Sequence, residues 1–266
     1  MFGGPLQLWL LNHLSTLEIA AVVVGGLVIV AVAGGTLAHR RYPKLAEGEH
    51  NDMVGVLLGM FGAIYGIILA FVVVTLWTQM QDARSVVAAE TTGLAQVVRD
   101  IRAFPPPEQR QLNAAVSGYV HRVVETQWPL MRAGKADYAA TESRMDGIYT
   151  VLQSYEPATE REKAFYGQTV ADLNGVVAQR RSRIAQSGQE LPPLLQVLVY
   201  GGALLIIPFT FLYGNTSRRA QLFFVGSVAA LIGFSLLLVL VLDRPFAGDL
   251  SVDPGPYRQG ALAQFW

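Results

Sequence analysis

Residues 53–78 read MVGVLLGMFGAIYGIILAFVVVTLWT, a run of twenty-six residues without a single charged side chain. A helix needs about 20 mainly apolar residues to cross the ~30 Å hydrocarbon core of a bilayer. Buried helices of soluble proteins seldom continue this far without a charge. This stretch therefore predicts a membrane-spanning helix, and it decides the fold class.

Three further stretches, 19–38, 191–217 and 220–242, are equally long and equally free of charge. Charged residues make up 15% of the 266-residue chain, against ~25% in an average protein. Residues 79–190 hold 26 of the 40 charges, 13 basic and 13 acidic. We predict an all-α integral membrane protein with four transmembrane helices arranged as two hairpins, and a soluble helical insert between spans two and three.

The predicted organisation follows these boundaries. We expect an interfacial segment at 1–18, a first transmembrane hairpin at 19–78, a soluble helical stalk and bundle at 79–190, a second hairpin at 191–242 and a tail at 243–266. The first span is expected to be a retained anchor, because residues 1–17 lack the Lys or Arg that starts a signal peptide. The predicted location is the inner cell membrane, with several crossings. Five basic residues in the short loops oppose six at the other face, so the positive-inside rule leaves the orientation open.

Composition and motifs exclude several classes of protein. The net charge of zero is not that of a nucleic-acid-binding protein, and the absence of cysteine excludes disulfides and thiolate metal sites. The chain has no GxGxxG, GxxxxGK[ST], GxSxG or HExxH motif. The spans contain no Asp, Glu, Lys or Arg, which proton-coupled transporters and intramembrane proteases normally need. The sequence therefore does not predict an enzyme; it predicts a passive pore or a scaffold.

The insert continues the second span as a helix. Ala83, Val87, Glu90, Leu94 and Val97 follow a 4-3-4-3 spacing, and no proline appears before Pro105, so residues 53–104 are predicted to form one helix of about fifty residues. A returning helix carries Arg180 at the same expected height as Glu90. We predict a Glu90–Arg180 ion pair; the alternative is a seam rotated by one residue, which leaves both side chains solvated.

Four glycines share one face of the second span: Gly55, Gly59, Gly62 and Gly66. Glycine costs ~1 kcal/mol per position in an ordinary helix, so this face is expected to serve close approach. It either packs against another helix or lines a pathway at the axis of an oligomer.

A second stripe lies roughly 100° around the same helix and contains Phe61, Tyr65, Ile68 and Val72. It is predicted to be a lipid face, a packing face or a hydrophobic constriction that gates by dewetting.

Several segments carry a family resemblance. These are GMFGAIYGIILAFVVVTLW (59–77), Glu90 in the following helix, RRSRI (180–184) and DRPFAG (243–248). Over residues 50–250 the chain resembles the bestrophin-like family of bacterial membrane proteins. Bestrophins are pentameric anion channels in which the second transmembrane helix lines the pore and carries an aromatic and aliphatic neck. The resemblance implies Phe61, Tyr65, Ile68 and Val72 as neck positions, although the sequence holds no close copy of the bestrophin neck motif.

The resemblance also bears on a metal ion. Asp243, Asp249 and Asp253 would supply oxygen ligands to Ca²⁺, as carboxylates near the membrane exit do in bestrophins. Their spacing is not that of an EF-hand loop, and the alternative is a solvated turn in which Asp243 contacts Arg244 or Arg219. No other cofactor is expected.

The predicted function is an oligomeric, bestrophin-like ion channel, passive and anion-conducting, with its pore lined by the second transmembrane helix. Its partners would be the lipid bilayer, inorganic ions and further copies of the chain, five in total by resemblance, but no nucleic acid. The alternative is a non-conducting scaffold or sensor that binds a partner through the helical insert.

Overall fold

The computed structural model describes residues 4–43, 48, 50–214 and 217–266, and these residues form helices and loops without a strand. Four helical stretches are long and apolar enough to cross a membrane: Thr16–Arg41, Asn51–Ala103, Pro193–Leu212 and Arg218–Leu242. They coincide with the four predicted spans, so the all-helical membrane class is confirmed. The grouping of the spans into two hairpins stays a prediction.

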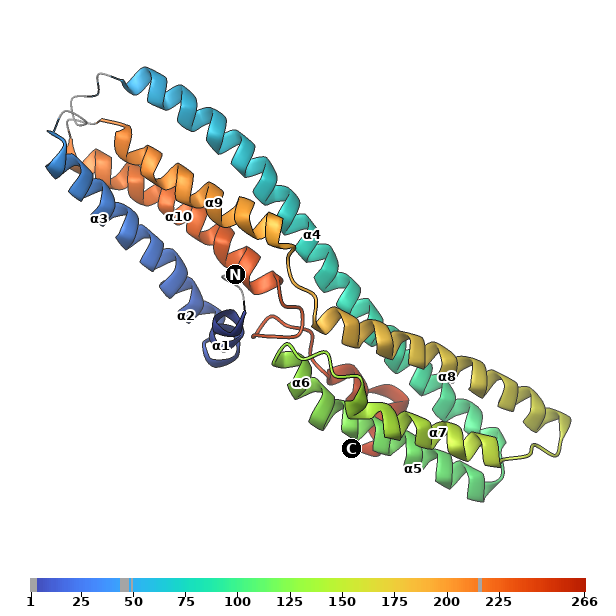
Figure 1. Ribbon diagram of the computed structural model, residues 1–266. Helices are drawn as coiled ribbons and strands as arrows, with labels where there is room; N and C mark the ends of the chain where they lie inside the picture. Colours follow the sequence, from blue (N-terminus) through green and yellow to red (C-terminus); the bar gives the residue numbers. More distant parts are fainter. Residues whose placement is uncertain (1–3, 44–47, 49, 215–216) are drawn as a thin grey trace. The chain divides into compact units, whose positions relative to one another are not determined.

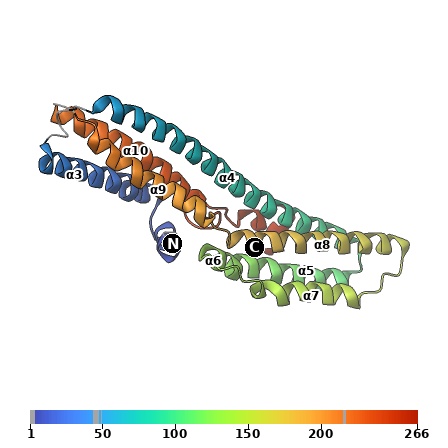
Figure 2. The same cartoon turned by 45° about the horizontal axis from the view of Figure 1, so that its top comes forward.

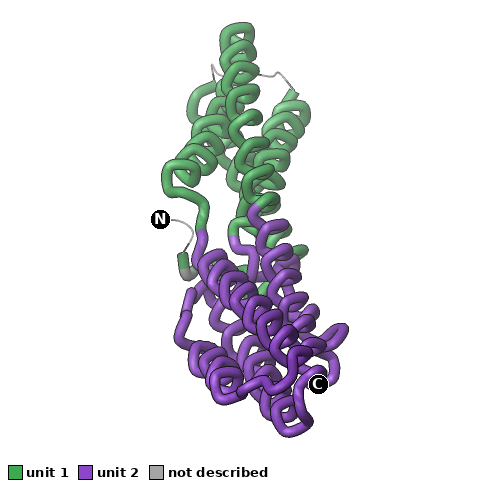
Figure 3. Tube along the Cα trace, turned by 90° about the vertical axis from the view of Figure 1, so that its right-hand side faces the viewer, with its two compact units in different colours: residues 1–78, 190–243 green, residues 79–189, 244–266 purple. Residues whose placement is uncertain are grey.

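The chain divides into two compact units, which Figure 3 distinguishes by colour. The first unit comprises residues 1–78 and 190–243, and holds the apolar helices. The second comprises residues 79–189 and 244–266, so it includes the C-terminal residues that the sequence analysis treats as a separate tail.

In the first unit, α1 (Pro5–His13) precedes α2 (Thr16–Ala20), which passes through a π-helical turn into α3 (Gly26–Arg41). The start of α2 is fixed by a capping box. The Ser15 hydroxyl accepts a hydrogen bond from the Glu18 N–H at 3.3 Å, and the Glu18 carboxylate accepts one from the Ser15 N–H at 2.8 Å. This cap explains why the helix begins just before the charge-free stretch.

Helix α9 (Pro193–Phe209) begins at a proline, where the missing N–H costs nothing. Helix α10 (Arg218–Leu242) packs against α3 and also contacts α9 (Figure 1). A side chain also joins α4 to the loop before α10. Asn51 donates to the Gly214 carbonyl at 2.7 Å and accepts from the Gly214 N–H at 2.8 Å.

Helix α4 (Asn51–Asp100) is a single helix of 50 residues, continued by a 3-10 turn at Ile101–Ala103. This confirms the prediction of one helix from the second span into the insert. Residues 51–78 belong to the first unit and residues 79–100 to the second. The helix stops before Pro105, because a proline interrupts the backbone hydrogen bonds of the preceding turn.

In the second unit, α4 is followed by α5 (Pro106–Arg122), a π-helical turn, α6 (Trp128–Arg132), α7 (Glu142–Ser154) and α8 (Glu160–Ser187). Helix α7 packs along α5 (Figure 2). The side chains of Leu94, Leu112, Ile148 and Leu173 are fully buried between these helices. The apolar spacings of the insert sequence thus correspond to its core, while the short α6 carries no such repeat and was not predicted.

Candidate functional site

Helix α4 has a covered side and an uncovered side along its whole length. The buried residues, here called the inner stripe, are Val54, Tyr65, Leu69, Val72, Leu76, Met80, Ala83, Val87, Glu90, Thr91, Leu94, Val97 and Val98. Exposed residues on the opposite side, here called the outer stripe, include Val56, Met60, Ala63, Ile67, Ala70, Val74, Trp77, Gln81, Arg84, Ala88, Thr92 and Arg99. At 100° per residue the outer stripe covers about 120° of the helix, opposite the inner one.

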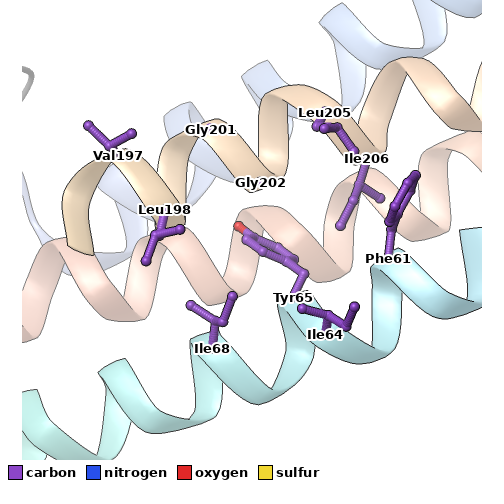
Figure 4. Close-up of a pocket in the computed structure, with 10 residues that line it drawn as sticks. All are labelled: Phe61, Ile64, Tyr65, Ile68, Val197, Leu198, Gly201, Gly202, Leu205 and Ile206. Atoms are coloured by element: carbon purple, nitrogen blue, oxygen red, sulfur yellow. The ribbon is translucent and has the colours of Figure 1, made fainter. Parts of the chain in front are cut away.

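The four predicted neck residues lie on the inner side of α4 and face α9 of the same chain. The Tyr65 hydroxyl donates to the Val199 carbonyl at 2.8 Å, and Val72 is fully buried. The Phe61 ring meets the Phe209 ring edge-on at 5.2 Å between centroids. Phe61, Tyr65 and Ile68 border an apolar cavity of about 270 Å³ between α4 and α9 (Figure 4). Tyr65 and Val72 are therefore core residues of the subunit, which does not favour the neck assignment for them.

In the part of the chain that the structure describes, no other helix packs closely on the glycine face of α4. A Cβ added at Gly59, Gly62 or Gly66 would find no atom within 4 Å, and one at Gly55 would meet only Tyr213, at 3.8 Å. An apolar cavity of about 410 Å³ adjoins Gly62 and Gly66 and is bounded on its other side by α10. Close packing inside the subunit thus does not explain these glycines.

A different glycine allows the close approach of α4 and α9. A Cβ added at Gly202 would overlap ring carbons Cδ2 and Cε2 of Tyr65, whereas a Cβ at Gly201 would meet nothing within 4 Å. Figure 4 shows the Tyr65 ring directed at this part of α9. The Tyr65 ring therefore sits directly on the backbone of α9.

We expect Gly202→Ala to destabilise the first unit by about 1–3 kcal/mol, because overpacking forces the ring or the backbone to move. Gly201→Ala is the matched control, and is expected to be neutral or slightly stabilising. Thermal unfolding of both variants in detergent measures the difference. Equal melting temperatures for the two variants would contradict the contact.

The inner stripe carries one charge, Glu90, which is fully buried in the second unit. Its carboxylate accepts from Arg183 of α8 twice, from Nε at 2.7 Å and from Nη2 at 3.1 Å. The hydroxyl of Tyr119 on α5 donates to the same carboxylate at 2.6 Å. Arg183 is also fully buried, and its Nη1 approaches the Met131 sulfur at 3.3 Å. This buried pair joins α4, α5 and α8.

The predicted partner of Glu90 is wrong by one helical turn. Arg180 instead pairs with Glu142 at 2.7 Å and donates to Thr141 Oγ1 at 2.9 Å. Side chains of a helix lean toward its N-terminus. Arg183 therefore reaches back to the level of residue 180, where Glu90 lies, and Arg180 reaches one turn further.

Burial controls the ionisation of this cluster. It raises the pKa of Tyr119 and of Tyr257 well above the ordinary value, and for Tyr119 the Glu90 carboxylate adds to the effect. Burial opposes the charge of Arg183, but the Glu90 carboxylate together with Tyr257 and Tyr119 outweighs it, so the pKa of Arg183 rises. At neutral pH Arg183 stays charged and both phenols stay protonated.

Two of the three aspartates proposed as Ca²⁺ ligands have separate hydrogen-bonding roles. Asp243 accepts from the Leu191 N–H at 2.7 Å and from Gln7 Nε2 at 3.1 Å, while Asp253 accepts from the Gly255 N–H at 2.6 Å. Among the residues that the structure describes, no three His, Asp or Glu side chains are grouped so that they could share a metal ion. The structure thus does not bring Asp243, Asp249 and Asp253 together.

Several residues of the buried cluster were not predicted. Tyr119 lies on the apolar spacing of α5 and was interpreted as core, although its hydroxyl binds Glu90. Trp128 and Tyr257 come from segments without a repeat, and their ring centroids lie 5.6 and 5.9 Å from the guanidinium carbon of Arg183. A signal for the pair itself was present, because Arg180 and Arg183 lie one turn apart on the same face of α8.

Comparison with known proteins gives one match. A family model described as Bestrophin-like domain matches residues 25–257, which is most of the chain. No curated protein and no solved structure matches the chain significantly.

Proposed function

This chain belongs to the bestrophin-like family, and we propose that it forms a homo-oligomeric channel that conducts anions passively, with α4 of each subunit lining the central axis. The protein would cross the inner cell membrane several times. The proposal reverses the face of α4 that the sequence analysis assigned to the pore. The outer stripe takes the place of Phe61, Tyr65, Ile68 and Val72.

The observation that carries the proposal is the uncovered outer stripe itself. Helix α4 extends from the membrane-spanning unit into the second unit, and its outer stripe is exposed in both. Exposed apolar side chains such as Ile67, at 72%, are ordinary on a lipid-facing helix. Ala88 and Thr92 continue the same exposed stripe in the second unit, where lipid is not expected. If copies of α4 from neighbouring subunits surround a common axis, the outer stripe would be exposed to that axis in both units.

The charges on the outer stripe favour anions. From Val56 to Trp77 the stripe is uncharged; Arg84 and Arg99 are its charged members in the second unit, and the exposed Asp52 lies at the other end of α4. In a ring of subunits each arginine becomes a ring of positive charge, which attracts anions to the mouth of the path. The glycines support the same geometry, because Gly59 and Gly66 lie within the arc of the outer stripe and keep the path from being filled by side chains.

The absence of ionisable side chains at membrane depth supports passive conduction. Residues 53–78 and 220–242 contain no Asp, Glu, Lys, Arg or His. Coupled transport normally depends on such groups inside the membrane. Permeating ions would therefore meet helix dipoles and partial hydration inside the membrane, and fixed charge only at the mouth.

Chloride efflux from liposomes tests the function. Purified protein is expected to release chloride, and Arg84→Glu is expected to lower the chloride-to-potassium permeability ratio roughly tenfold, since each reversal replaces attraction by repulsion. Arg110→Glu is the matched control, because Arg110 is exposed on α5 and away from α4. An absence of flux, or identical ratios in the two variants, would contradict the proposal.

A further inference from the structure

The C-terminal segment, residues 244–266, packs onto the second unit and reaches its buried charge pair. Within this segment Phe246, Val252, Tyr257 and Leu262 are buried. Tyr257 is fully buried, and its ring lies 5.9 Å from the guanidinium carbon of Arg183. Tyr257 therefore lies beside Arg183 although two membrane spans, α9 and α10, separate the two residues in the sequence.

The aromatic rings around Arg183 exclude water from its guanidinium group. Glu90 engages two of its nitrogens, and the rings of Trp128 and Tyr257 lie within 6 Å of the guanidinium. A cation near an aromatic face gains electrostatic attraction, and the gain grows when water is excluded. A buried ion pair depends in turn on the exclusion of water and on complete hydrogen bonding. Removal of the Tyr257 ring would open the pair to water on one side.

Residues 244–266 contain little regular secondary structure. Its helical parts are two 3-10 turns, Gly255–Arg258 and Gly260–Phe265, and no α-helix is present among residues 244–266. A cavity of about 380 Å³ separates part of it from α6, with Trp128 and Val252 among the lining residues. The segment therefore depends on its buried side chains for attachment, and elements with few such contacts open at low cost in free energy.

We propose that residues 244–266 are a latch that keeps the Glu90–Arg183 pair dry, so that attachment or release of the latch sets the mobility of the adjoining part of α4. When the latch is attached, Glu90 stays locked between Arg183 and Tyr119. When it is released, water reaches Arg183 and the pair loosens, which frees one side of α4 near residue 90. This inference does not rest on ion conduction and holds for a channel or for any other function.

Hydrogen–deuterium exchange of the full-length protein in detergent tests the latch. Tyr257→Ala is expected to speed exchange in residues 86–94 of α4 by about tenfold, because opening of the pair becomes easier there. Tyr257→Phe keeps the ring and is expected to exchange at the wild-type rate in these residues. Leu250→Ala is the matched control on the same segment, because Leu250 is 53% exposed and lies outside the buried cluster.

Three results would overturn the latch. One is a wild-type rate at residues 86–94 in Tyr257→Ala. A second is an equal effect of Tyr257→Ala and Leu250→Ala on these residues. The third is an equal rise in α7, which lies outside the cluster and would then report general unfolding. Faster exchange at residues 86–94, with α7 unchanged, supports the latch even if liposomes show no flux.

Discussion

Arg183→Leu is expected to lower the free energy of unfolding of the second unit by about 3–5 kcal/mol, the largest stability effect of any substitution considered for this chain. The variant leaves the Glu90 carboxylate in a fully buried site without its counter-charge. The Tyr119 hydroxyl still donates to this carboxylate, but one neutral donor does not replace a bidentate guanidinium. Thermal unfolding monitored by circular dichroism in detergent is expected to show a melting temperature lower by ~10 °C or more.

Two further variants separate the lost charge from lost packing. The double variant Glu90→Leu/Arg183→Leu is expected to recover most of the loss, because apolar pairs often replace buried ion pairs at little cost. Arg180→Leu is the matched control. Its partner Glu142 is 54% exposed and rehydrates once the pair is removed, so the expected cost is only about 1–2 kcal/mol. Equal losses for Arg180→Leu and Arg183→Leu would contradict the assigned role of the buried pair.

The elements of the fold were largely predictable because they depend on local patterns. Charge-free length predicted the four spans, and the absence of proline before Pro105 predicted that α4 continues to Asp100. The buried spacing Ala83, Val87, Glu90 and Leu94 also predicted the inner side of the stalk.

The same buried spacing also bears on the neck residues. Extended backward in steps of four and three, the spacing of Ala83 reaches Leu76, Val72, Leu69 and Tyr65, which are all buried. The proposed neck residues and the stalk seam are therefore one continuous packing face. The resemblance to bestrophins pointed instead to an aromatic stripe at the pore, whereas the phase of the helix favours packing inside the subunit for these residues.

The partner of Glu90 was not predictable from backbone height alone. The register was close, because a Cβ at Gly93 would lie 2.8 Å from Val176. The error came from treating arginine as a point at its Cα, although its side chain extends by about one turn toward the helix N-terminus. Tyr257 has no periodic neighbours in the sequence, so its contact with Arg183 depends on tertiary packing that no local pattern encodes.

The second large effect concerns water in the membrane-spanning part of the outer stripe. The chain has no cysteine, so a single introduced thiol is the only target for a charged thiol reagent. Such reagents modify thiols in water and not thiols in lipid, because the reactive thiolate does not form there. Ala70 lies in the middle of the outer stripe, is exposed in the subunit and borders the cavity between α4 and α10. If α4 lines a path, the thiol of Ala70→Cys faces that path.

Two alanines provide matched controls for Ala70→Cys. Ala33 is exposed on α3 in another apolar span, and we expect its thiol to face lipid. Ala83 is on α4 but fully buried on the inner stripe. Both cysteine variants are expected to be unreactive and to keep their flux, which would place the reactive position on one face of one helix.

The most direct measurement is therefore chloride flux in liposomes that carry Ala70→Cys, before and after a negatively charged methanethiosulfonate reagent. The account predicts rapid modification and a fall in flux of about tenfold, since a bulky charge at each subunit obstructs the axis. Ala33→Cys and Ala83→Cys should show neither effect. The account is contradicted if Ala70→Cys conducts normally and is as unreactive as Ala33→Cys, because the outer stripe of α4 would then face lipid.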